Sequence, residues 1–114
     1  MLLLFPTANA QAPIEEAEPP LTGKGEYVEY ATKKAVEANI SPSVVLSVIE
    51  CESQWNERAI GDGTHSRGLA QIHNLYHPDI SDEEAYDARF AIDFLVENIA
   101  EGRGNMWTCY RKLK

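Results

Sequence analysis

Apolar positions recur at helical spacing in three stretches of this chain. The stretches cover residues 26–38, 42–53 and 88–101, and each predicts an amphipathic helix. The apolar positions of the first and third stretches are Tyr27, Tyr30, Ala31, Ala35, Ala38 and Phe90, Ala91, Phe94, Leu95, Ile99. Runs that alternate apolar and polar residues, as exposed strands do, reach only about four residues. The sequence therefore predicts a mainly α-helical fold.

The second stretch contains an acid at a position that is otherwise apolar. Ser41 is a suitable N-cap, and Pro42 occupies the first helical position, where its missing N–H costs nothing. One face of this helix carries Val45, Val48, Ile49 and Glu52 at the spacing i, i+3, i+4 and i+7. A carboxyl group in apolar surroundings has a raised pKa and keeps its proton, as a general acid must. The alternative is that Glu52 lies at the last turn, where the face reaches solvent.

The segments between the second and third stretches are short. Residues 54–67 are expected to form a loop, because glycines flank an aspartate at positions 61–63. Residues 68–72 are too few to distinguish a short helix from a short strand. Ser81 and Glu84 have the spacing of a capping box, which predicts the start of a short helix.

Length and charge limit the classes of function. The chain has 114 residues, of which 44% are hydrophobic, and this composition suits one domain with a modest core. Its formal net charge is −8, and its isoelectric point is about 4.8. An acidic chain does not bind nucleic acid or anionic membranes non-specifically. We expect a monomer with no nucleic-acid and no membrane partner, which captures its substrate by shape, hydrogen bonds and stacking.

The N-terminal residues differ in composition from the rest. Residues 1–10 are apolar and end in Ala8-Asn9-Ala10, which is typical of a secretory cleavage site. They lack a positive region and are too short to span a bilayer, so we expect a truncated signal-like segment; an apolar terminus without function is the alternative. Residues 11–24, with three prolines and three glutamates, are expected to be a disordered linker. The folded domain is then 25–114.

The chain has two cysteines, Cys51 and Cys109. In an oxidising compartment they permit one disulfide, which would close a loop of roughly sixty residues and stabilise the fold by about 4 kcal/mol. The alternative is two separate buried thiols, because free cysteine packs as a small hydrophobic residue. A bridge agrees with export, and we expect a secreted or periplasmic, cell-wall-associated protein.

A series of short motifs begins at the end of the second predicted helix. In order, they are Glu52-Ser53, Asn56, Ala59-Ile60, Ser66 and Gly68-Leu69-Ala70-Gln71. This series resembles the soluble lytic transglycosylase (SLT) family of the lysozyme-like superfamily. Residues 87–102 resemble the family's next helix, and the resemblance covers residues 27–110. It implies a mainly α, single lysozyme-like domain with a helical core and a glycine-rich loop beside the cleft.

The resemblance implies a reaction in which Glu52 is the catalytic acid. In the family, one acid protonates the β-1,4 glycosidic oxygen between N-acetylmuramic acid and N-acetylglucosamine of peptidoglycan. It then acts as a base on the C6 hydroxyl of the muramic acid, and a 1,6-anhydro ring closes. The first alternative is a hydrolytic lysozyme, or muramidase, in which Asp62 would be the second carboxylate, although Asp62 is also an ordinary turn residue. The second alternative is a peptidoglycan-binding module without turnover.

Candidate substrate-binding residues follow from the same resemblance. They are Ser53, Ser66, Gln71, Ile72, Trp107 and Tyr110. The tail departs from the family, because many members carry Ala-Tyr-Asn-Ala-Gly, whose tyrosine faces the acid. Here Trp107 is a candidate for stacking on a sugar ring and Tyr110 for a hydrogen bond near Glu52, and core packing is the alternative for both aromatic residues. Gly68 is expected to let the backbone turn close to the substrate.

The histidines do not predict a metal site. His73 and His77 are four residues apart, but no third ligand stands at the required spacing. Pro78 also argues against a helix that would bring the two rings together. We therefore expect neither a metal nor another cofactor.

Overall fold

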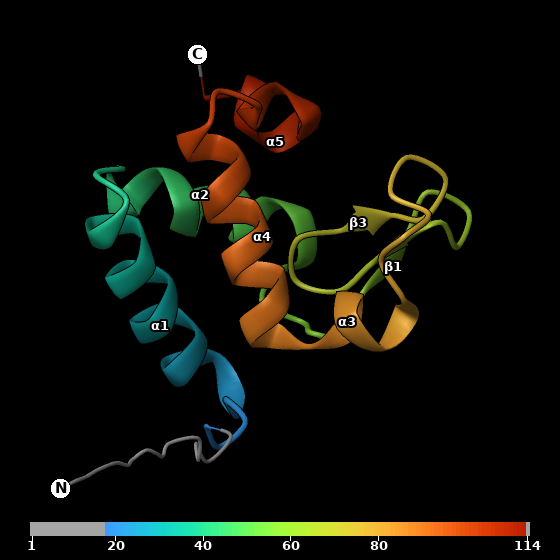
Figure 1. Ribbon diagram of the computed structural model, residues 1–114, viewed down its shortest axis with the longest axis horizontal. Coiled ribbons are helices and arrows are strands. Elements are labelled where there is room, and N and C mark those ends of the chain that lie inside the picture. The colour runs from blue at the N-terminus through green and yellow to red at the C-terminus, as the bar shows by residue number, and fades with distance from the viewer. Residues whose placement is uncertain (1–17, 114) are drawn as a thin grey trace, which may run out of the picture.

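The computed structural model describes residues 18–113, and helices form most of the domain (Figure 1). The signal-like segment 1–10 and residues 11–17 lie outside the described residues. The first helix starts at Gly23, slightly before the predicted start of the fold at Gly25. The helices are α1 (Gly23–Glu37), α2 (Pro42–Ser53), α3 (Asp82–Tyr86), α4 (Ala88–Ala100), the 3-10 helix η2 (Gly104–Met106) and α5 (Thr108–Arg111). None of the helices within residues 18–113 is long and apolar enough to cross a membrane.

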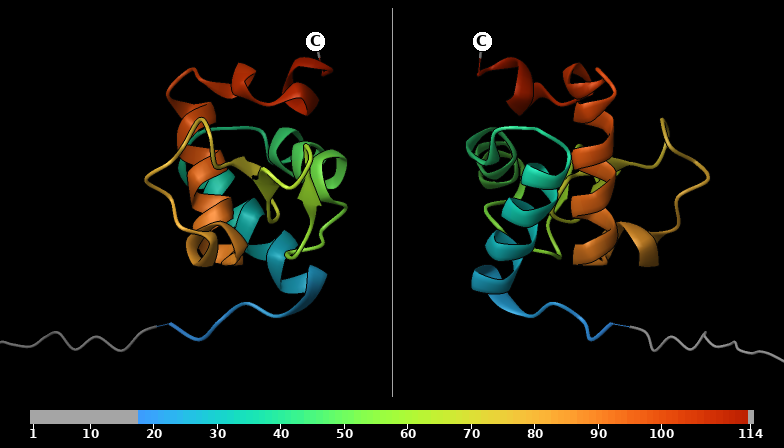
Figure 2. Two further views of the ribbon diagram at one scale, coloured as in Figure 1. Left: turned by 90° about the vertical axis from the view of Figure 1, so that its right-hand side faces the viewer. Right: turned by 60° about the vertical axis from the view of Figure 1, so that its left-hand side comes forward.

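The predicted helical stripes form the core. α1 contacts both α2 and α4, and Figure 2 shows α1 lying beside α4. Ala31 of α1 and Leu95 of α4 are fully buried, as the stripes predict. Phe90 and Phe94 are only half-buried, because the buried face of α4 is centred closer to Ile92. Phe94 therefore keeps part of its surface outside the core.

A small antiparallel sheet lies within residues 60–73, where the sequence predicts a loop up to residue 67 and does not distinguish helix from strand at 68–72. Its strands are β1 (Ile60–Gly61), β2 (Ser66–Arg67) and β3 (Ile72–His73), in the order β1-β2-β3. Ile60 pairs with Arg67, and Ser66 pairs with His73. Residues 68–71 form the turn between β2 and β3. Strands of two residues carry no periodic signal, which explains why the alternation of polarity did not predict them.

Two local features define α3 and its neighbour. One stabilises the start of the helix, and the other brings its backbone close to the turn after β2. The predicted capping box is confirmed: the Glu84 N–H donates to Ser81 Oγ at 3.0 Å, and the Ser81 N–H donates to Glu84 Oε1 at 3.0 Å. Gly68 has a φ of +81°, and a Cβ there would lie 2.0 Å from the carbonyl oxygen of Ala85. Gly68 was expected to bring the backbone close to the substrate; its close neighbour here is the backbone of α3, and it is not among the residues that line the cleft.

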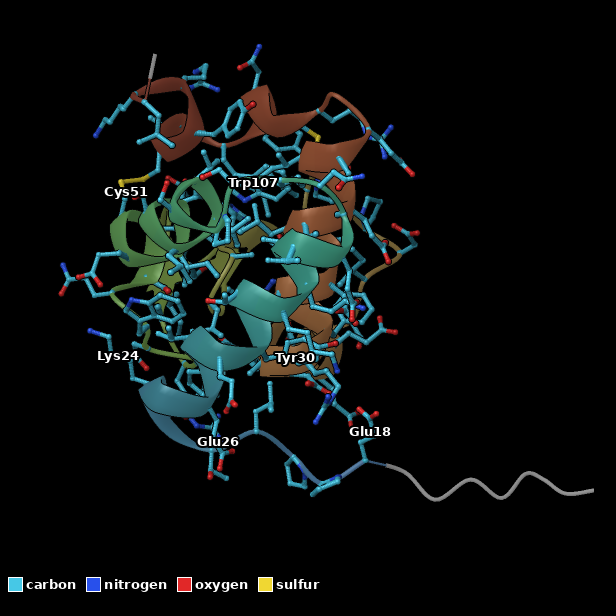
Figure 3. The ribbon with its side chains drawn as sticks, turned by 90° about the vertical axis from the view of Figure 1, so that its left-hand side faces the viewer. Glu18, Lys24, Glu26, Tyr30, Cys51 and Trp107 are labelled. Carbon is cyan, nitrogen blue, oxygen red and sulfur yellow. A yellow bond between two sulfur atoms is a disulfide. The ribbon has the colours of Figure 1, made fainter. Side chains whose placement is uncertain are left out.

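A disulfide joins the end of α2 to the C-terminal region. Cys51 and Cys109 are bonded, with their Cα atoms 5.9 Å apart. Figure 3 shows the bond at the labelled Cys51, with α5 lying across that end of α2. Of the two possibilities for the cysteines, the structure contains the bridge.

Candidate active site

Glu52 lies in the last turn of α2, at the end of an apolar stripe. Val45, Val48 and Ile49 are fully buried, and Glu52 is half-buried. The helix ends one residue later, because Gln54 takes a left-handed conformation with a φ of +53°. Both interpretations of the stripe therefore hold in part: Glu52 adjoins the core, and its carboxyl group reaches the surface of a cleft.

The surroundings of Glu52 favour its protonated form. Burial, the largest effect, raises the pKa of the Glu52 carboxyl group. The backbone N–H of Cys109 donates to Glu52 Oε2 at 3.2 Å and lowers this pKa. The negative charge of Asp62 raises it again, while the cations Lys112 and Arg111 lower it. The net shift is upward, as a general acid requires.

Glu52 lines a cleft of about 610 Å³ between the sheet and the C-terminal region. Its floor consists of Glu52, Asp62, Ser66, Gln71 and Ile72. One side, here called the loop wall (residues 73–81), contributes His73, Tyr76 and His77, with Phe94 of α4 beside it. The other side, here called the α5 wall (residues 105–111), contributes Asn105, Met106, Trp107, Thr108 and Arg111. The cleft combines polar groups on its floor with aromatic rings on both sides, which is a common lining for a small-molecule binding site.

Five of the sequence-predicted site residues line this cleft, and two do not. Those in the lining are Glu52, Ser66, Gln71, Ile72 and Trp107. Ser53 is absent from it, because successive helical residues point in different directions. Its side chain is buried, and its Oγ donates to the carbonyl oxygen of Ile49 at 3.1 Å. Tyr110 is also absent; its ring packs against Gly104, where a Cβ would lie 2.6 Å from it.

Internal hydrogen bonds fix the polar groups of the floor. Gln71 Nε2 donates to the carbonyl oxygens of Ala59 at 3.1 Å and Gly68 at 3.0 Å. Ser66 is almost fully buried, and its Oγ donates to Asp62 Oδ2 at 2.8 Å. The two bonds of Gln71 go to backbone carbonyl groups, so they are compatible with a glutamine that supports the loop as well as with one that contacts substrate. They also orient Asp62 toward the strand that follows its turn.

Trp107 connects the α5 wall to the floor. Its Nε1–H donates to the carbonyl oxygen of Ala70 at 2.7 Å, and its ring packs edge-on against Phe94 at 6.0 Å. Trp107 is 5% exposed, so most of the ring is packed within the domain. Figure 3 shows the labelled Trp107 below α5. The ring therefore packs in the core while its remaining surface faces the cleft.

Several lining residues carried no usable signal in the sequence. Phe94 belonged to a helical stripe and was expected in the core, and Tyr76 lay in a segment with no motif. His73 and His77 were considered only as metal ligands. Within residues 18–113, histidine, cysteine and acidic side chains form no group of three that could hold a metal ion.

The comparison with protein families agrees with the geometry of the cleft. The model of the transglycosylase SLT domain family matches residues 29–110, which include Glu52, the sheet and most of the cleft lining. Searches of curated proteins and of solved structures find no significant match. SLT domains act on peptidoglycan and cleave its glycosidic bonds. Because the match covers most of the chain, this protein belongs to the transglycosylase SLT domain family of the lysozyme-like superfamily.

Proposed function

We propose that this domain is a lytic transglycosylase in which Glu52 is the single catalytic acid and base. One observation carries the proposal: a half-buried glutamate with a raised pKa faces a cleft at the end of an apolar helical stripe. An acid whose pKa is raised keeps its proton to higher pH, which suits it to protonate a leaving group. The family's action on peptidoglycan supplies the substrate.

In the proposed reaction Glu52 acts twice, first giving up its proton and then taking one from the substrate. First, the Glu52 carboxyl group protonates the β-1,4 glycosidic oxygen, and the bond from that oxygen to C1 of the N-acetylmuramic acid breaks. The C6 hydroxyl of the same sugar then bonds to C1 and gives its proton to the Glu52 carboxylate. The products are a free 4-hydroxyl on N-acetylglucosamine and a 1,6-anhydro-muramic acid. Glu52 ends protonated, so the acid is restored without water or a cofactor.

The neighbours of Glu52 support this cycle. The Cys109 N–H stabilises the carboxylate that exists between the two proton transfers. Ile72 and Trp107 supply apolar surface for a sugar ring, and Ser66 and Gln71 supply polar groups on the floor. Ser53 and Tyr110 support the residues that form the site and do not contact the substrate, because neither lines the cleft.

Asp62 supports a second candidate, a hydrolytic muramidase of the same fold. It lines the same cleft as Glu52, and its charge acts on the pKa of Glu52. A second carboxylate near the acid is what a hydrolytic enzyme uses to position water. The two candidates differ in their products, because water enters only the hydrolytic reaction.

The test of the proposed role is Glu52→Gln, with Glu50→Gln as its matched control. Glu50 lies on the same helix, and its side chain is 58% exposed on another face. We expect Glu52→Gln to reduce the rate of peptidoglycan cleavage about 10²- to 10⁴-fold, the usual contribution of a general acid. We expect Glu50→Gln to be as active as the wild type. Unchanged cleavage by Glu52→Gln would contradict the assignment, and absent cleavage in the wild type would favour a binding module.

We also propose that the domain works outside the cytoplasm, where peptidoglycan lies. The disulfide between Cys51 and Cys109 supports this location, because such bonds persist in oxidising compartments. Fractionation of expressing cells, with the thiols blocked at lysis, tests it. A reduced protein in the cytoplasmic fraction would contradict the proposal.

A further inference from the structure

The loop wall presents an aromatic side chain that the proposed chemistry does not use. In the left-hand view of Figure 2, the segment that follows β3 bulges outward from the helices. Tyr76 lies on this segment, is 78% exposed and lines the cleft. A large aromatic ring that is ordered yet open to solvent offers a face to a ligand.

A second ring supports Tyr76 from one side. The rings of His73 and Tyr76 have centroids 4.5 Å apart with an angle of 35° between their planes. The His65 ring stacks on His73 at 5.3 Å, and the Leu75 N–H donates to His73 Nδ1 at 3.2 Å. His65 Nδ1 lies 3.0 Å from Asn74 Oδ1, which ties the third ring to the same loop.

Arg67 joins the two ends of the loop wall. Its Nε donates to the carbonyl oxygen of Ile72 at 3.1 Å, just before the loop. Its Nη1 donates to Asp82 Oδ1 at 2.7 Å and lies 3.5 Å from the carbonyl oxygen of Ile80, at the other end. The guanidinium group therefore spans the base of the loop that carries Tyr76.

Burial of Arg67 costs more free energy than a contact with a purely structural role would require. Arg67 is 3% exposed, and its Nη2 is buried with no hydrogen-bond partner among the described residues. Burying a guanidinium group costs free energy, and a well-packed apolar side chain at such a position often gives equal or greater stability. The geometric benefit of the arginine is its planar fork, which holds the two loop ends in one orientation.

We propose that Tyr76, backed by the His73 ring, forms a stacking platform for one sugar ring of the glycan strand, and that Arg67 is the positioning residue that holds this platform at the rim of the cleft. The proposal rests on the proposed function for its ligand class. The platform belongs to the loop wall, whereas the hydrogen bond to Glu52 comes from the α5 wall, so the platform binds substrate and takes no part in proton transfer. Its loss raises KM, while kcat changes little.

The test measures binding in the Glu52→Gln background, with a soluble β-1,4-linked N-acetylglucosamine tetramer as the probe. We expect Tyr76→Ala to weaken binding about fivefold. We expect Arg67→Met to weaken it to a similar extent and to speed amide hydrogen exchange across residues 74–81. The double variant should bind no more weakly than the weaker single variant, because both changes remove the same platform. Tyr30→Phe, which removes the bond to Asp93 at 2.7 Å on α4, is the matched control and should change neither readout.

Two further variants keep the test decisive. Asp82→Asn removes the ion pair through an exposed partner and leaves the buried arginine in place. It should speed exchange of the loop to a smaller degree than Arg67→Met, and it replaces that variant if Arg67→Met does not fold. Arg67→Lys should restore the fold but only part of the binding, since lysine lacks the fork. Unchanged binding by Tyr76→Ala, unchanged loop exchange in the Arg67 and Asp82 variants, or additive losses in the double variant would overturn the proposal.

This experiment can fail separately from the proposed function. Binding is measured without turnover, so a muramidase or a transglycosylase would give the same result. Glycan cleavage that depends on Glu52, together with unchanged binding by Tyr76→Ala, would reject the platform alone.

Discussion

The two walls of the cleft are held in place by different kinds of bond. The α5 wall is joined to α2 by the disulfide between Cys51 and Cys109, and the Cys109 N–H contacts Glu52 directly. The loop wall is held at its base by the polar contacts of Arg67. Covalent attachment thus serves the wall beside the reacting bond, where small displacements of the acid are costly. Polar contacts serve the wall that we assign to binding, where adjustment to a substrate is tolerated.

The largest expected effect comes from removing the covalent attachment. Cys51→Ala/Cys109→Ala should lower the free energy of unfolding by about 4 kcal/mol, because the bridge closes a loop of 58 residues in sequence separation. It should also reduce cleavage, because α5 is then free to move away from Glu52. Urea unfolding and a peptidoglycan cleavage assay measure both changes. Reduction of the wild type should reproduce them, and a fully stable, fully active double variant would refute the distinction between the walls.

A smaller effect is expected where the α5 wall meets the floor. Trp107→Phe removes the donor to the Ala70 carbonyl oxygen and should cost about 2 kcal/mol of stability, since a buried acceptor loses its partner. Thermal unfolding measures this loss. Trp55→Phe is a suitable control, because Trp55 is also buried but does not line the cleft. Peptidoglycan cleavage is measured for both variants. If both lose the same activity, Trp107 acts through general stability and not through the cleft.

Ser81, whose side chain belongs to the capping box, is the last residue of the loop wall, so a change there tests this wall at its C-terminal end. Ser81→Ala should cost about 1 kcal/mol, because the Glu84 N–H loses its side-chain acceptor. Exchange of the α3 amides should become faster, while the pH dependence of cleavage stays unchanged. A shift in the pH profile of this variant would show that the loop wall communicates with Glu52.

The smallest effects concern charges around Glu52. As a general acid, Glu52 is active when protonated, so kcat/KM should fall as pH rises through its raised pKa. Asp62→Asn should lower this pKa and move the fall to lower pH, while Lys112→Gln should move it to higher pH. Each change amounts to about twofold in rate at a fixed pH on the falling side. Loss of more than about 100-fold in Asp62→Asn would instead favour the muramidase.

The same raised pKa has a consequence for stability. Glu52 holds its proton more strongly in the folded protein than in the unfolded chain, because burial disfavours its charge. Its stabilising contribution is therefore complete below the unfolded pKa and is lost as pH rises through the folded pKa. Comparing the pH dependence of unfolding between the wild type and Glu52→Gln measures this loss. Parallel curves would contradict the raised pKa.

Local signals predicted the elements that hold the acid. Pro42 marked the start of α2, its apolar stripe predicted the buried face, and α2 spans the predicted residues. Ser41 takes the N-cap position, but its side chain makes no capping hydrogen bond. The spacing of Ser81 and Glu84 likewise predicted the start of α3. Each of these signals lies within one or two turns of helix, so no knowledge of distant contacts was needed.

Distant contacts account for what the sequence did not predict. Arg67 contacts a residue fifteen positions away, and Tyr76 lines the cleft together with residues that are distant from it in sequence. The position of Ser53 outside the cleft lining has a local cause: a motif names neighbours in sequence, but a helix turns about 100° between them, so the Ser53 side chain is buried while Glu52 lines the cleft. Pairings across the fold and directions around a helix both require the three-dimensional arrangement.

The products of peptidoglycan digestion in H₂¹⁸O test the central claim most directly. We predict muropeptides that end in 1,6-anhydro-muramic acid, carry no ¹⁸O at C1 and are absent when Glu52→Gln replaces the wild type. Mass spectrometry of the soluble products distinguishes these ends from hydrolysed ones. Reducing ends labelled with ¹⁸O would show that water is the nucleophile and would contradict the transglycosylase mechanism.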